Sequence, residues 1–98
     1  MGDRICLTFT DGKSFSPTLY SHWDGMDLID WARDFYNIYC KEVRTEPENW
    51  MVNFIAYLTQ GRVKDGNLYL YPCRDASASP DDNGYWMMNT KTGEIKRY

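Results

Sequence analysis

Residues 19–25 read Leu19-Tyr20-Ser21-His22-Trp23-Asp24-Gly25, and they join a predicted β-hairpin to a predicted helix. Before them, residues 4–10 alternate and are rich in strand-forming types, and the Asp11-Gly12 pair that follows is a strong turn signal. The returning strand is predicted over residues 13–21. Pro17 favours an edge position or a bulge there, because proline has no N–H to donate to a ladder.

Two amphipathic helices are predicted in the middle of the chain. The first begins at Asp24, which we expect to cap the first turn, and runs to about Val43. Its apolar face consists of Leu28, Trp31, Ala32, Phe35 and Tyr39. The second helix is predicted to begin with a capping box of Thr45 and Glu48 and to end at Gly61 in the left-handed conformation. Its apolar stripe consists of Trp50, Met51, Phe54, Ile55 and Leu58.

The last third of the chain is predicted to form three short strands, over residues 68–71, 84–89 and 94–98, with a polar loop at residues 74–83. The element order is then ββ-α-α-βββ. The chain has 98 residues, the length of one ordinary domain. We therefore predict a single α+β domain over residues 1–98. It is expected to be a two-layer sandwich, in which an antiparallel sheet of about five strands carries both helices on one face.

Charge and cysteine content exclude several classes of protein. The net charge is −3, which disfavours binding to duplex DNA, because the affinity of proteins for duplex DNA comes mainly from contacts of Lys and Arg with phosphates. The three cysteines, Cys6, Cys40 and Cys73, are far apart and form no C-x-x-C pair, so we expect no metal site, no cofactor and three reduced thiols. No apolar run is long enough for a membrane span, and we expect a cytoplasmic protein.

The leading candidate surface combines residues 22 and 23 with the acidic face of the first helix. Asp27, Asp30 and Asp34 share one side of that helix, where they repel one another and could occupy a basic groove on a partner. A solvated outer face is the alternative. His22 and Trp23 are expected to brace the corner between strand and helix, with partner contact as the alternative. We therefore predict a non-enzymatic accessory protein that acts by contact with an unidentified protein partner.

A different hypothesis places a metal or a small ligand at His22. The imidazole is close in sequence to Asp24 and Asp27, and a histidine beside carboxylates can act as a general base or a metal ligand. Metal sites usually need three or four converging ligands, and no cysteine is spaced to supply one. We therefore rank this hypothesis below protein contact.

The C-terminal strands suggest a second alternative, which is binding of single-stranded nucleic acid. Residues 62–98 carry more bases than acids, and aromatic side chains are interleaved with those bases. Aromatic rings on a sheet can stack on unpaired bases. The candidate residues are Tyr69, Tyr71, Trp86, Lys96 and Arg97.

The outer face of the second helix is polar but uncharged. Its residues are Asn49, Asn53, Ala56 and Gln60. Faces of low charge are disposed to bury against a partner, which includes a second copy of the same chain. A homodimer is therefore a further expectation.

Four short segments in a fixed order carry a resemblance to a known group of proteins. They are Tyr20-Ser21-His22-Trp23-Asp24-Gly25, Glu46-Pro47-Glu48-Asn49-Trp50, Gly66-Asn67-Leu68-Tyr69 and Asp81-Asp82-Asn83-Gly84-Tyr85. In this order, after an N-terminal hairpin, the chain resembles a family of small, largely uncharacterised proteins of phages, prophages and archaea. The resemblance implies a cytoplasmic accessory protein that acts on host or mobile-element machinery, and it supplies no reaction and no catalytic residue.

Overall fold

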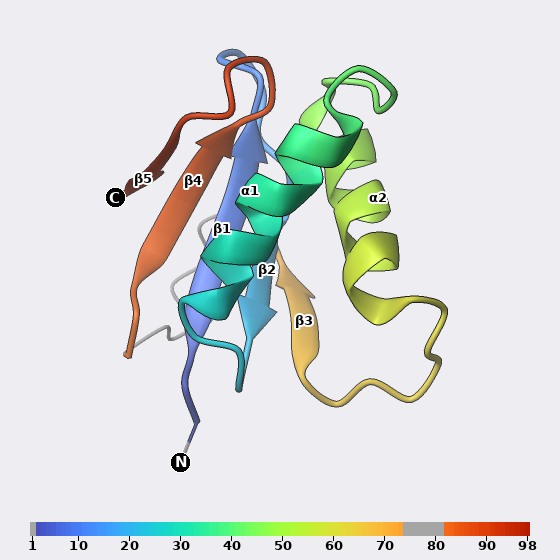
Figure 1. Ribbon diagram of the computed structural model, residues 1–98. Coiled ribbons are helices and arrows are strands. Elements are labelled where there is room, and N and C mark those ends of the chain that lie inside the picture. The colour runs from blue at the N-terminus through green and yellow to red at the C-terminus, as the bar shows by residue number, and fades with distance from the viewer. Residues whose placement is uncertain (1, 74–81) are drawn as a thin grey trace.

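The computed structural model describes residues 2–73 and 82–98, which form two helices and a five-stranded sheet (Figure 1). In chain order the elements are β1 (Ile5–Thr10), β2 (Thr18–Ser21), α1 (Asp27–Tyr39), α2 (Pro47–Thr59), β3 (Leu68–Tyr71), β4 (Tyr85–Asn89) and β5 (Ile95–Arg97). The chain is therefore an α+β protein. Of the polar loop predicted at residues 74–83, residues 74–81 lie outside the described residues.

The sheet is mixed, so the prediction of a wholly antiparallel sheet is wrong. Its strand order is β3-β2-β1-β4-β5, in which β1 and β4 run parallel and the other neighbours run antiparallel. β2 occupies one edge of β1, so β4 pairs with the other edge. Residues 72–84 connect β3 to β4. This connection is long enough to cross the sheet, whereas a tight hairpin turn would be too short.

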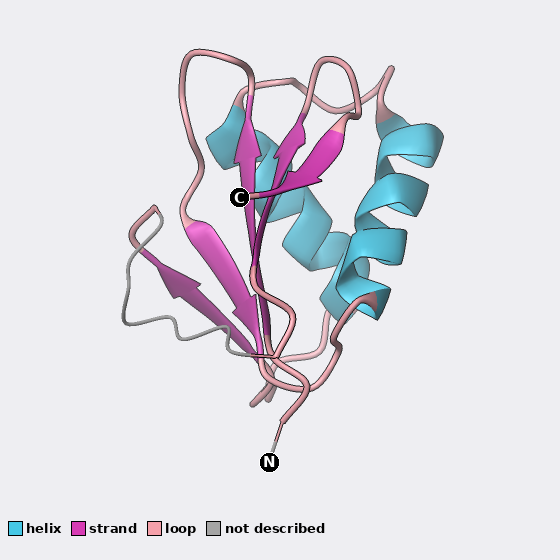
Figure 2. Ribbon diagram, turned by 90° about the vertical axis from the view of Figure 1, so that its left-hand side faces the viewer, coloured by secondary structure: helices cyan, strands magenta, loops and turns pink. Residues whose placement is uncertain are grey.

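Both helices lie against the same face of the sheet (Figure 2). Alternate residues of β1 point to this face, and the buried residues of both helices pack on them. The buried core consists of Ile5, Leu7, Phe9, Leu19, Leu28, Ile29, Ala32, Phe35, Trp50, Met51, Phe54 and Met88. The indole of Trp50 is fully buried, with ring centroids 5.4 Å from Phe35 and 6.4 Å from Phe9. Its Nε1 has no hydrogen-bond partner among the described residues.

Helix ends follow different contacts from those predicted. α1 begins after Met26, and neither helix has a side-chain cap within the described part of the chain. The Thr45–Glu48 capping box does not form; instead the Thr45 carbonyl accepts a hydrogen bond from Thr90 Oγ1 at 2.6 Å. α2 ends in the left-handed conformation at Gln60 (φ 49°), one residue before the predicted cap, and Gly61 also has the predicted positive φ, of 82°.

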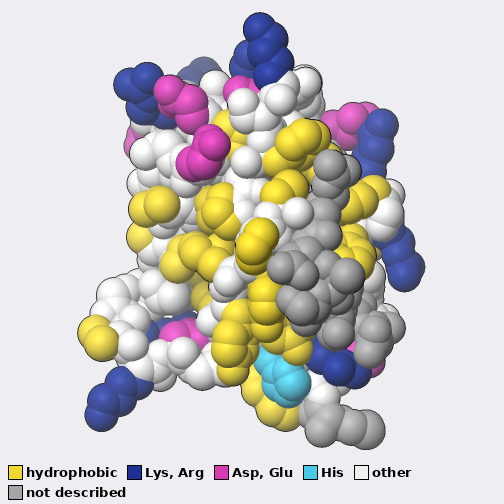
Figure 3. Space-filling model, turned by 180° about the vertical axis from the view of Figure 1, so that it is seen from behind, with side chains coloured by type: hydrophobic (Ala, Val, Ile, Leu, Met, Phe, Trp, Pro, Cys, Tyr) yellow, Lys and Arg dark blue, Asp and Glu magenta, His cyan; other side chains and the backbone are white. Residues whose placement is uncertain are grey.

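The sheet face away from the helices carries a second, smaller cluster. Cys6 and Tyr20 are buried there, with Tyr71 and Tyr85 packed against them. Hydrophobic side chains gather over this face of the molecule (Figure 3). Burial raises the pKa of the Cys6 thiol to about 12 and raises the pKa of the Tyr20 hydroxyl as well.

Burial of the Cys6 thiol predicts that the folded protein loses stability in alkali. The unfolded chain releases the Cys6 proton near pH 9.0, whereas the folded protein holds it to about pH 12. The stabilising contribution is complete below pH 9.0 and is lost as the pH rises toward 12, because unfolding then releases a proton. We expect the free energy of unfolding to fall between about pH 9 and about pH 12, and to fall less steeply in Cys6→Ala. Urea titrations across this range provide the measurement, and equal slopes for the two proteins would contradict the assignment.

In the ranges 2–73 and 82–98, no helix has both the length and the apolar character needed to cross a bilayer.

Candidate functional site

The imidazole of His22 lies in a tight corner at the end of β2. Its Nδ1 is 2.8 Å from the hydroxyl oxygen of Tyr20, and its ring meets the indole of Trp23 edge-on with centroids 4.5 Å apart. The backbone at Gly2 lies against the other side, since a Cβ there would come within 3.0 Å of His22 Nε2. The imidazole of His22 is therefore half-buried, with contacts to its own chain from Tyr20, Trp23 and Gly2.

The side chain of Asn67 fixes the backbone of this corner from across the sheet edge. Its Oδ1 accepts hydrogen bonds from the backbone N–H of Trp23 at 2.9 Å and of His22 at 3.1 Å. Its Nδ2 donates to Asp24 Oδ2 at 2.8 Å, and Ser21 Oγ donates to the same oxygen at 2.8 Å. We call Ser21, Asp24 and Asn67 the corner clamp. Asp24 is thus a clamp residue, and the prediction that it caps the first helix is wrong.

Asn67 was missed by sequence reasoning, although a local signal precedes it. Asp65 Oδ1 accepts the backbone N–H of Asn67 at 2.7 Å and of Leu68 at 3.0 Å, which holds the turn before β3. The Asp-Gly-Asn sequence predicts that turn. It does not predict that the turn presents the Asn67 amide to residues 22–24, because that contact spans more than forty residues.

The N-terminal segment closes the corner from the opposite side. Asp3 N–H donates to the His22 carbonyl, and Gly25 N–H donates to the Asp3 carbonyl, both at 2.8 Å. Gly25 is buried, has φ 56°, and lies so close to the Asp3 carboxylate that a Cβ would collide with it. The backbone conformation and the close approach both require glycine at this position.

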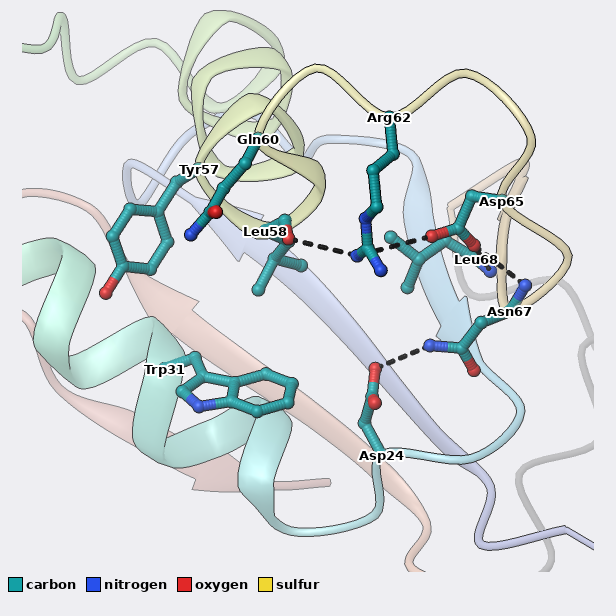
Figure 4. A pocket seen from close by; sticks show the side chains of 9 residues that line it. All are labelled: Asp24, Trp31, Tyr57, Leu58, Gln60, Arg62, Asp65, Asn67 and Leu68. Carbon is teal, nitrogen blue, oxygen red and sulfur yellow. Dashed lines mark hydrogen bonds and ion pairs between the residues drawn. The ribbon is translucent and has the colours of Figure 1, made fainter.

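A pocket of about 460 Å³ opens beside the corner clamp, between α1, the end of α2 and the connection to β3 (Figure 4). It is lined by Asp24, Trp31, Tyr57, Leu58, Gln60, Arg62, Asp65, Asn67 and Leu68. Figure 4 shows the indole of Trp31 extending across the floor toward Asp24, with Arg62 reaching in from the opposite side. Among these residues, the sequence pointed to Asp24 beside His22 and to Gln60 on the uncharged face of the second helix, and it predicted no pocket here.

The predicted partner-binding residues of α1 face solvent next to this corner. The side chains of Asp27, Asp30 and Asp34 are exposed, and the nearest cation is Arg33, 3.8 Å from Asp30. Trp23 is 58% exposed and Met26 is 42% exposed, so both side chains present apolar surface to solvent. We call Trp23, Met26, Asp27, Asp30 and Asp34 the junction surface.

The predicted nucleic-acid residues are divided between the two faces of the sheet. Tyr69 and Tyr71 lie on the face away from the helices, with ring centroids 6.5 Å apart, and the strand register places Lys96 on that face too. Trp86 packs against the helix-side core and pairs in register with Arg97, so both belong to the other face. The structure therefore places three of the five on one face, with Tyr69 and Tyr71 at the β3 edge of the sheet and Lys96 at the opposite, β5 edge.

Two further sequence hypotheses can be placed on the structure. Within the described residues, no three His, Cys, Asp or Glu side chains converge as metal ligands would. On the uncharged face of α2, Asn53 Nδ2 donates to Asn49 Oδ1 at 3.2 Å, and the neighbouring Val52 is 65% exposed. The homodimer hypothesis for this face stays a prediction.

Comparisons with known proteins gave no relative from which a role could be transferred: no family model, no curated protein and no solved structure matches the chain.

Proposed function

We propose that the protein is a non-enzymatic recognition module that binds a basic segment of a partner protein through the junction surface. The observation that carries the proposal is the exposed indole of Trp23 on a backbone that the corner clamp holds in place. Aromatic side chains on fixed backbone are effective anchors, because they bury a large area and lose little conformational freedom on binding.

The charge of the junction surface supports a basic partner. Three carboxylates lie along one side of α1, and a single arginine partly offsets them. Complementary charge on a partner would speed its association and fix its orientation, and both effects weaken with salt. Three unpaired cysteines and the resemblance to small phage, prophage and archaeal proteins support an accessory role in the cytoplasm.

Reversing charge on α1 is expected to weaken partner capture. Asp30→Lys combined with Asp34→Lys puts cations where the partner's cations approach, which weakens binding at least about tenfold. Glu42→Gln is the matched control, since Glu42 is an exposed acid beyond the end of α1. The immobilised variants are exposed to an extract of the source cells, the captured protein is identified, and its affinity is measured in pure form at two salt concentrations. Equal affinity for the wild type and the double variant would contradict the proposal.

Single-strand binding remains the second candidate, because Tyr69 and Tyr71 lie on the same sheet face. Lys96, the candidate base on that face, is 3.5 Å from Glu94, which offsets its charge. An oligonucleotide titration at low salt separates the two candidates. Saturable binding that is lost in Tyr69→Ala would favour the tyrosine face over the junction surface.

A further inference from the structure

The pocket beside the corner clamp has the size and the walls of a small-molecule site. Its volume of about 460 Å³ lies in the range of ligand pockets. The apolar part of its lining comes from Trp31, Tyr57, Leu58 and Leu68, which belong to α1, α2 and β3. An alkyl chain would fit such a lining, and the broad face of an indole is the best aromatic surface for a cation.

The charged groups in the lining are not equivalent, because two of them already have partners. Arg62 Nε donates to the Thr59 carbonyl at 3.1 Å, and its Nη2 donates to the Leu58 carbonyl at 3.3 Å. The same Nη2 lies 3.7 Å from Asp65 Oδ2. The arginine charge is therefore directed to the C-terminal carbonyls of α2 and to one carboxylate.

The remaining charged group in the pocket lining is the carboxylate of Asp24. Its Oδ2 accepts hydrogen bonds from Ser21 and Asn67, which fix the direction of the carboxylate. Its Oδ1 has no partner among the described residues, and no cation lies within ion-pair distance of it there. The pocket thus holds one oriented carboxylate oxygen beside an aromatic wall.

We propose that this pocket binds a cation at the end of an alkyl chain, a guanidinium or an ammonium group. The alkyl part lies over Trp31 and Leu58, and the charged end donates to Asp24 Oδ1. An anionic ligand is disfavoured, because the lining contains two carboxylates and one already engaged arginine. This site does not depend on the junction surface, since its lining shares no residue with Trp23, Met26, Asp27, Asp30 or Asp34.

A titration with four small probes of similar shape tests the site. Isotope-labelled protein is titrated with n-butylguanidinium, n-butylammonium, n-butylurea and butyrate, and the indole N–H signals of the four tryptophans are followed. The two cations are expected to shift the Trp31 signal in a saturable way and to leave the Trp50 signal in place, because Trp50 is fully buried away from solvent. The two cations should bind about tenfold more tightly than n-butylurea, because the uncharged urea cannot make a charge-assisted hydrogen bond to Asp24. Equal binding of urea and guanidinium, tighter binding of butyrate, or no response at Trp31 would overturn the proposal.

Two variants and one control locate the contact. Asp24→Asn removes the charge and keeps an oxygen for Ser21 and Asn67, and it should weaken cation binding about tenfold. If Asp24→Asn does not fold, Trp31→Leu provides the test, because it removes the aromatic face and leaves the clamp intact. Glu42→Gln should bind like the wild type. Unchanged affinity in the folded pocket variants would refute the site.

The same titration identifies the source of the cation. Agmatine represents a free small molecule, and the capped peptide acetyl-Gly-Arg-Gly-amide represents a partner's arginine side chain. Tighter binding of agmatine indicates a metabolite site, and tighter binding of the peptide indicates a side-chain anchor. Failure of both, with the butyl probes also silent, rejects the pocket without affecting the junction surface, whose test is partner capture by the α1 charge variants.

Discussion

Replacing Trp50 with alanine is expected to destabilise the folded protein by about 4 kcal/mol, the usual cost of removing a large aromatic side chain from a core. The indole extends from α2 and is fully buried against β1 and α1, where it contacts the rings of Phe9, Phe35 and Tyr36. A domain of this size has a total stability of only about 5–15 kcal/mol, so the variant is expected to be partly unfolded at moderate temperature.

The nature of the Trp50 site is tested by a milder substitution. Because Nε1 has no hydrogen-bond partner among the described residues, Trp50→Phe loses ring volume and no hydrogen bond, and it should cost less than about 2 kcal/mol. Val52→Ala on the exposed side of the same helix is the control, with an expected change within about 0.5 kcal/mol. Urea titrations followed by circular dichroism measure all three. Equal losses of unfolding free energy in Trp50→Phe and Trp50→Ala would contradict this interpretation, because they would indicate that the indole N–H makes a stabilising hydrogen bond in the folded protein.

Replacing Asn67 with alanine is expected to cost about 3 kcal/mol, because several hydrogen-bonding groups lose their partner together. The backbone N–H of Trp23 loses its acceptor, that of His22 keeps only the Asn67 backbone carbonyl at 3.0 Å, and Asp24 loses a donor. The loss should be local as well as global. Amide hydrogen exchange at residues 22–25 should speed up more than exchange in β1, and uniform acceleration would contradict the role of the corner clamp.

Asn67→Asp separates the two halves of the Asn67 side chain. The variant keeps an oxygen for the backbone N–H groups, but it places a second carboxylate beside Asp24 in place of the Nδ2 donor. Like charges at this distance repel, and protonation of either one removes the repulsion. The loss of stability relative to the wild type should therefore be larger at neutral pH than at about pH 4. A loss independent of pH would show that Asp24 is not the neighbour that matters.

The arrangement of local elements could be predicted because it depends on local patterns. The β3 strand has the predicted bounds, and the predicted helices contain α1 and α2 with excess residues at their ends. The start of the first helix was predicted wrongly because the Asp24 carboxylate accepts hydrogen bonds from Ser21 and Asn67 and does not cap the helix. The parallel pairing of β1 and β4 joins strands almost eighty residues apart, and no local pattern encodes it.

The candidate sites, like the fold, could be predicted from the sequence only in part. Alternation along a strand already implies that Tyr85 and Trp86 point to opposite faces, as do Lys96 and Arg97, so the division of the nucleic-acid candidates was within reach of the sequence. The pocket was not, because α1, α2 and the turn before β3 each contribute part of its lining. The exposure of Trp23 was also not predictable, since an aromatic residue at a strand–helix junction is compatible with a buried brace.

Fluorine NMR of protein labelled with fluorotryptophan tests recognition at the junction surface most directly, because the four tryptophans lie in four different environments. Trp23 lies on the junction surface, Trp31 in the pocket, Trp50 in the core and Trp86 on the helix-facing side of β4. On addition of the captured partner, the Trp23 resonance is expected to shift first and furthest, while those of Trp50 and Trp86 hold their positions. A complex in which Trp86 responds and Trp23 remains as in the free protein would contradict recognition at the junction surface.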